Sequence, residues 1–106
     1  MREAVIVSAA RTPIGKAYCG AFNATPSPTL ADHAIKHAVQ RAGLEGGEVK
    51  DVLIGASLQQ GVQGMNIARS ATLRAGLPTQ VSAMSLDRQC GPGLKPISSV
   101  FSTIDS

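Results

Sequence analysis

Residues 81–94 read VSAMSLDRQCGPGL, and the interpretation of the whole chain starts from this stretch. Its first part, Val81 to Leu86, alternates apolar and small polar side chains, a pattern that predicts a β-strand. The strand runs almost directly into Cys90, which a Gly-Pro-Gly tripeptide follows. We therefore expect a cysteine at the carboxyl end of a strand, where a helix would begin.

Two more apolar runs lie upstream, Ala4 to Ala10 and Val52 to Ala56. Continuous runs rich in β-branched residues are typical of strands buried on both faces of a parallel sheet. The first run is too short to cross a membrane, and Glu3 stands where a signal peptide would carry basic residues. Both runs are therefore predicted to be strands, and no membrane partner is expected.

Two helices are predicted between these strands. The first follows Ser27, whose hydroxyl would cap it, with Pro28 at the first helical position; apolar side chains then recur every three or four residues up to Gly43. The second covers residues 67–75, between a capping Asn66 and Gly76. Residues 11–25 and 59–65 are expected to be loops. The order βαβαβ predicts an α/β fold with a mainly parallel sheet, whose ligand sites lie beyond the carboxyl ends of the strands.

The composition limits the class of protein. With 106 residues, 43% of them hydrophobic and 16% charged, the chain has room for one globular domain. Only 3% are aromatic, and the charges behind the net +3 are scattered, so a nucleic-acid partner is not expected, whereas an anionic ligand suits the surface. Two cysteines in different surroundings indicate free thiols in a reducing compartment, and we expect the cytoplasm.

Cys90 is the main candidate for chemistry. A thiol at the start of a helix would meet unpaired N–H groups and the positive end of the helix dipole, and both favour the thiolate. A thiolate is a good nucleophile for acyl transfer, and Gly91 and Gly93 would let backbone amides approach a substrate oxygen. The alternative is a buried structural cysteine, because free cysteine is among the most buried residue types.

Other candidate sites are weaker. The sequence Cys90-Gly91-Pro92-Gly93 is similar to the Cys-Gly-Pro-Cys motif of dithiol oxidoreductases but lacks the second sulfur, which leaves only a single-thiol redox role as an alternative. His33 and His37 lie four residues apart and could face one metal ion. With no third ligand evident, a solvated helix surface is favoured, and no metal site is predicted. Cys19 is interpreted as an ordinary loop thiol.

Several stretches together resemble the amino-terminal part of the thiolase family, the acetyl-CoA acetyltransferases and 3-ketoacyl-CoA thiolases. The resemblance is clear over residues 3–94, and it rests on these segments: residues 4–16 (AVIVSAARTPIGK), 51–55 (DVLIG), 66–69 (NIAR), 87–90 (DRQC) and 93–94 (GL).

The resemblance implies an enzyme of lipid metabolism in which Cys90 takes the acyl group of an acyl-CoA as a thioester. A second acyl-CoA is then condensed onto that group, or a 3-ketoacyl-CoA such as acetoacetyl-CoA is cleaved in the reverse direction. Coenzyme A thioesters are the substrates, no metal or prosthetic group is implied, and full-length members are expected to be homo-oligomers. Residues that bind coenzyme A are not identified.

The resemblance also implies missing parts. Family members are several times longer and supply a histidine that activates the cysteine, together with a second cysteine that handles a proton. His33, His37 and Cys19 do not match these motifs, so only Cys90 is carried over.

The sequence after Leu94 is not clearly related to the family. Pro96 is expected to fall inside the next helix and to cost about 3 kcal/mol. We therefore expect a truncated thiolase-like half-domain over residues 1–106, inactive alone, with an open sheet edge that makes it poorly stable or oligomeric. The main rival interpretation is a non-catalytic structural or interaction module.

Overall fold

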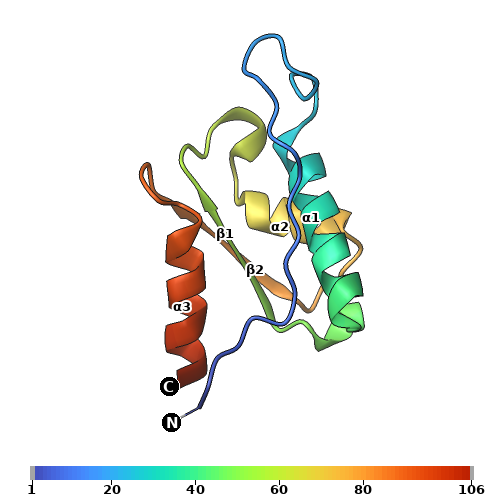
Figure 1. Cartoon of the computed structure of the whole chain (residues 1–106), viewed down its shortest axis with the longest axis vertical. Coiled ribbons are helices and arrows are strands. Elements are labelled where there is room, and N and C mark those ends of the chain that lie inside the picture. Colours follow the sequence, from blue (N-terminus) through green and yellow to red (C-terminus); the bar gives the residue numbers. More distant parts are fainter. Residues whose placement is uncertain (1, 106) are drawn as a thin grey trace.

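The structure is a computed structural model that describes residues 2–105. Within them, a parallel sheet of two strands is combined with three α-helices (Figure 1). The predicted α/β class is therefore confirmed. In chain order the elements are α1 (Ser27–Ala42), the 3-10 helix η1 (Gly46–Glu48), β1 (Asp51–Ala56), the 3-10 helix η2 (Gly61–Gln63), α2 (Ile67–Arg74), β2 (Ser82–Asp87) and α3 (Leu94–Asp105).

The sheet has the expected parallel pairing. Asp51 of β1 lies opposite Ser82 of β2, and the register continues to Ala56 opposite Asp87. The intervening α2 forms the crossover that parallel neighbours require. Both strands lie within one residue of their predicted positions, so the carboxyl ends of β1 and β2 meet at the same edge of the sheet.

The ends of α1 agree only in part with expectation. Gly43 ends the helix in a left-handed conformation with φ of 70°, as its position predicts. The cap at the other end was wrongly predicted: Pro26 occupies the cap position and Ser27 is already helical, with no side-chain hydrogen bond to the cap. Pro28 tolerates this shift because it still lies in the first turn, where backbone N–H groups have no partner within the helix.

The core lies between α1, α2 and the sheet. Helix α2 contacts both strands and α1 packs on α2. Buried Ala75, Leu77 and Val81 form a cluster against which Ile35 and Val52 pack. Small side chains on the buried face of α2 permit this close approach of the layers.

An ion pair joins the two packed helices. The buried Asp32 of α1 lies 2.6 Å from Nε of Arg74 at the end of α2, and 3.8 Å from Nζ of Lys36. The guanidinium of Arg74 therefore neutralises a carboxylate that burial would otherwise destabilise.

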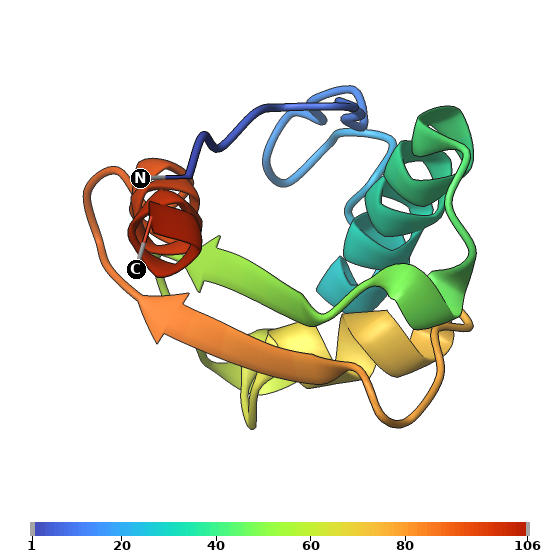
Figure 2. The ribbon, with the colours of Figure 1, turned by 90° about the horizontal axis from the view of Figure 1, so that it is seen from below.

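The expected first strand is not formed. Residues 4–10 lie on the side of the sheet that carries α3, away from α2 (Figure 2), without ladder hydrogen bonds. Val5, Ile6 and Val7 are 71%, 73% and 71% exposed. A strand buried on both faces needs packed layers on either side, whereas here a cavity of about 410 Å³ separates the segment from β1 and α3. The prediction of a buried strand was therefore wrong for this chain.

The expected break at Pro96 is also absent. Helix α3 begins at Leu94, so Pro96 is only its third residue and lies in the first turn. A proline there removes no intrahelical hydrogen bond, because the first four N–H groups of a helix have no acceptor within it. The ring is buried, and the helix continues to Asp105. The predicted cost of helix disruption therefore does not arise.

Candidate functional site around Cys90

Cys90 lies in the short loop that joins β2 to α3, three residues beyond the end of β2 and four before α3 begins. Its side chain is exposed and its thiol is free. The alternative of a buried structural cysteine is thereby contradicted. The loop stands at the carboxyl ends of both parallel strands, where α/β folds place their ligand sites.

Hydrogen bonds fix the first half of this loop to the sheet. The backbone N–H of Arg88 donates to the carbonyl of Ala56 at 2.9 Å, one residue beyond the last strand pair. The carboxylate of Asp87 accepts from Gln89 Nε2 at 3.2 Å and from the backbone N–H of Gln59 at 3.4 Å. Asp87 thus connects the loops that follow β1 and β2, and Cys90 comes directly after this anchored stretch.

The second half of the loop is held by packing on β1. The backbone of Pro92 crosses Gly55 so closely that a Cβ atom at this glycine would overlap the Pro92 carbonyl oxygen. The same Cβ would lie 3.1 Å from Cγ of Pro96. Neither Gly55 nor Asp87 was assigned a role from the sequence alone, although a glycine inside a strand often marks a close backbone approach.

Asn66 ties the start of α2 to β2, on the flank of the site. Its Oδ1 accepts from the N–H of Arg69 at 3.1 Å and from the hydroxyl of Ser85 at 2.9 Å. Its Nδ2 donates to the carbonyl of Ala83 at 3.1 Å. The predicted cap is therefore confirmed, and Asn66 adopts a left-handed φ of 66° to provide it.

The other predicted candidates lie elsewhere. His33 and His37 are on α1 with ring centroids 4.4 Å apart, and α1 lies across the molecule from the loop before α3 (Figures 1 and 2). Cys19 is exposed in the long loop that precedes α1. Among residues 2–105, no group of three or more metal-binding side chains comes together. These are the only two histidines in the sequence, so the structure places no histidine beside Cys90.

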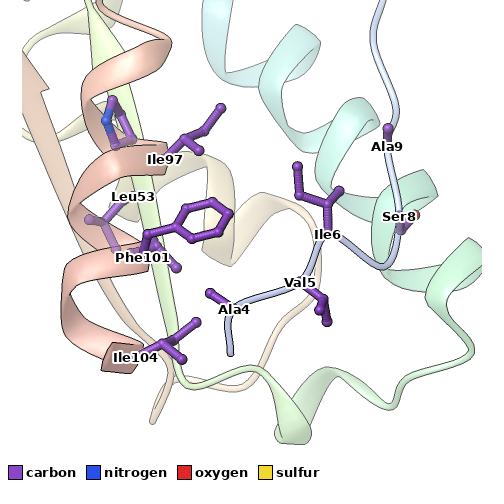
Figure 3. A pocket seen from close by; sticks show the side chains of 11 residues that line it. Ala4, Val5, Ile6, Ser8, Ala9, Leu53, Ile97, Phe101 and Ile104 are labelled. Carbon is purple, nitrogen blue, oxygen red and sulfur yellow. The ribbon is translucent and has the colours of Figure 1, made fainter. Parts of the chain in front are cut away.

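An apolar cavity occupies a different part of the molecule. Ile97, Phe101 and Ile104 extend from α3 toward the N-terminal segment and line the cavity with Leu53 of β1 and Ile6 (Figure 3). Cys90 is not part of its lining. The cavity is a gap in packing between elements rather than a chamber for the thiol.

The site is thus an exposed thiol on a loop that is fixed at both ends and rich in glycine. Such a thiol can attack an electrophilic carbonyl from solvent, and Gly91 and Gly93 beside it carry no side chains that would obstruct a bulky thioester. Within the part of the chain that the structure describes, no helix has the length and apolar character to cross a membrane.

The chain has clear relatives. A family model for the thiolase N-terminal domain matches residues 4–106. Over 97 residues the chain is 44% identical to an acetyl-CoA acetyltransferase of Cupriavidus necator, 41% to a 3-ketoacyl-CoA thiolase of Bacillus subtilis and 45% to a mitochondrial acetyl-CoA acetyltransferase of Xenopus tropicalis. Each alignment covers 92% of this chain but 24%, 25% and 23% of the respective relative. The chain spans about a quarter of the length of these relatives, and through its match to their N-terminal domain it belongs to the thiolase family.

Proposed function

We propose that this chain is the nucleophile-bearing part of a thiolase-type acyltransferase, in which Cys90 accepts an acyl group from an acyl-CoA. The observation that carries the proposal is the position of an exposed, free thiol at the carboxyl ends of β1 and β2 in a chain of this family. The names of the relatives, acetyl-CoA acetyltransferase and 3-ketoacyl-CoA thiolase, support coenzyme A thioesters as substrates and a place in lipid metabolism.

The proposed chemistry is a thioester exchange. The Cys90 thiolate attacks the carbonyl carbon of the acyl-CoA, the bond from that carbon to the coenzyme A sulfur breaks, and coenzyme A leaves as a thiol after taking up a proton. The product is an S-acyl cysteine intermediate. In condensation, the α-carbon of a second acyl-CoA loses a proton and attacks the carbonyl of the S-acyl cysteine, the bond to the Cys90 sulfur breaks, and a 3-ketoacyl-CoA leaves. In cleavage, the Cys90 thiolate instead attacks the 3-keto carbon of a 3-ketoacyl-CoA, the bond between C2 and C3 breaks, and the departing acyl-CoA carbanion takes up a proton. The thiolate of free coenzyme A then takes the acyl group from Cys90. No metal or prosthetic group takes part.

Turnover needs proton transfer to and from the reacting groups, and no histidine of this chain lies beside Cys90. Both of its histidines are on α1, across the molecule from the loop before α3. We infer that the 106-residue chain alone does not complete the cycle, and that the remaining groups come from protein corresponding to the other three quarters of its relatives. With both cysteines free, a reducing compartment is expected, and we infer the cytoplasm.

A hybrid enzyme tests this function. The 97-residue stretch of the Cupriavidus necator enzyme that aligns with this chain would be replaced by the corresponding residues of this chain. We expect the hybrid to cleave acetoacetyl-CoA in a reaction that depends on free coenzyme A, at a rate within about a hundredfold of the parent, because small errors in positioning cost up to that factor. Substrate loss is followed spectrophotometrically.

An inactive hybrid would contradict the proposal, provided that circular dichroism shows it to be as folded as the parent. That result would favour the second candidate, a non-catalytic interaction module. The exposed apolar side chains of residues 4–10 and of α3 around the cavity support this alternative, since such surfaces mark contacts with other protein. A single-thiol redox role stays a prediction without further support.

A further inference from the structure

Gly55 holds a position where the strand and the cysteine loop come into direct contact. It lies in the interior of β1, opposite Leu86 of β2 in the parallel register. The loop that carries Cys90 returns across this point before α3 begins, so that the backbone of Pro92 rests on the strand. A glycine offers the flat surface that this crossing requires.

The requirement for glycine at position 55 is steric, because a side chain there would clash with residues outside β1. A Cβ at Gly55 would overlap the carbonyl oxygen of Pro92 and would meet the ring of the buried Pro96 at 3.1 Å. Both of these are rigid parts of the chain, a backbone carbonyl and a proline ring, and neither can rotate away as the end of a long side chain would. By contrast, a Cβ at Gly47 in η1 would come no nearer than 4.0 Å to Pro78.

Cys90 lies between two points at which its loop contacts β1. On one side the N–H of Arg88 donates to the carbonyl of Ala56, and on the other side Pro92 rests on Gly55. These strand residues are neighbours, so the loop is closed over the carboxyl end of β1 with the thiol at its middle. A Cβ at Gly55 would therefore have to displace the backbone of Pro92, two residues from Cys90.

We propose that Gly55 is a positioning residue for the nucleophile. Because it has no side chain, the backbone of Pro92 can pack directly on β1, and this contact fixes the loop of residues 88–93 and thereby orients Cys90. This inference rests on the proposed function only in that Cys90 is the reacting group. The contact itself is a property of the 106-residue chain and can be measured without any acyl transfer.

The test uses Gly55→Ala in the full chain, with Gly47→Ala as the matched control. We expect the amide resonances of residues 88–91 and of Gly93 to shift in the ¹H–¹⁵N spectrum of Gly55→Ala, while those of α1 keep their positions. The rate of Cys90 alkylation by iodoacetamide, divided by that of Cys19 in the same molecule, should change by at least about threefold, because thiol reactivity depends on the surroundings of the sulfur. Gly47→Ala should leave this ratio unchanged.

Two results would overturn the proposal. One is an unchanged ratio of alkylation rates in folded Gly55→Ala; the other is a set of shifts spread evenly over the chain, which would indicate general loosening. If Gly55→Ala does not fold, the unchanged chain tests the contact directly: nuclear Overhauser effects are expected between the Hα protons of Gly55 and protons of Pro92 or Gly93, and their absence would reject the contact.

The same substitution in the hybrid separates the two hypotheses. There Gly55→Ala should lower kcat roughly 10- to 100-fold with KM for acetoacetyl-CoA nearly unchanged, since a displacement of about 1 Å is enough for such a loss. Full activity in Gly55→Ala together with loss of activity in Cys90→Ser would reject the positioning role alone. Activity that survives Cys90→Ser would reject the proposed function.

Discussion

Cys90→Ser is expected to lower the rate of acetoacetyl-CoA cleavage by the hybrid enzyme at least about 10⁴-fold, because the variant removes the atom that carries the acyl group. A serine hydroxyl fits the same space but is almost wholly protonated at neutral pH, and it is a far weaker nucleophile than a thiolate. Steady-state rates with saturating coenzyme A give the comparison.

Cys19→Ser is the matched control. Cys19 is also exposed and free, but it lies in the loop before α1. The Cys19→Ser hybrid should therefore cleave acetoacetyl-CoA at a rate within about twofold of the unchanged hybrid. If Cys90→Ser kept more than a tenth of the activity, or if the two variants lost activity equally, Cys90 would not be the nucleophile.

Asn66→Ala is expected to destabilise the 106-residue chain by about 2–4 kcal/mol. Loss of a helix cap costs about 1 kcal/mol. The hydroxyl of Ser85 and the carbonyl of Ala83 each lose a partner in a part-buried place, at about 1 kcal/mol or more. Alanine also tolerates the left-handed φ of 66° less well than asparagine. Urea unfolding followed by circular dichroism measures the change.

Two variants make the result specific. Asn66→Asp keeps the acceptor for Arg69 and Ser85 and loses only the donor to Ala83, so about 1 kcal/mol of destabilisation is expected. Ser70→Ala, at an exposed position of the same helix, should change the free energy of unfolding by less than about 0.5 kcal/mol. Equal effects of Asn66→Ala and Ser70→Ala would show that the network around Asn66 does not hold α2 to β2.

Local patterns were enough to predict the central βαβ unit. The apolar run at Val52 and the alternation after Val81 lie in β1 and β2, and Asn66 and Gly43 directly flank the helices whose ends they predict. Each depends on residues close together in sequence, and tertiary packing agrees with them here. The resemblance to thiolases was also confirmed by the family match over residues 4–106.

The predictions that failed concern features that depend on the rest of the folded chain rather than on the local sequence. Residues 4–10 have the composition of a buried strand, but composition does not supply the layers that must cover both faces. Pro96 was assigned to a helix interior because the sequence does not show where the helix begins, and a start at Leu94 makes the proline harmless. The contact of Gly55 with Pro92 joins residues far apart in sequence, and only the folded chain reveals it.

The most direct test of the central claim is to trap the acyl intermediate. The hybrid is mixed with acetyl-CoA, quenched in acid within seconds and digested, and the peptide that contains Cys90 is analysed by mass spectrometry before and after hydroxylamine. The account predicts one acetyl group on Cys90, removed by hydroxylamine, absent from Cys90→Ser and unaffected by Cys19→Ser. A folded, active hybrid with no acetyl group on Cys90, or with the group retained in Cys90→Ser, would contradict it.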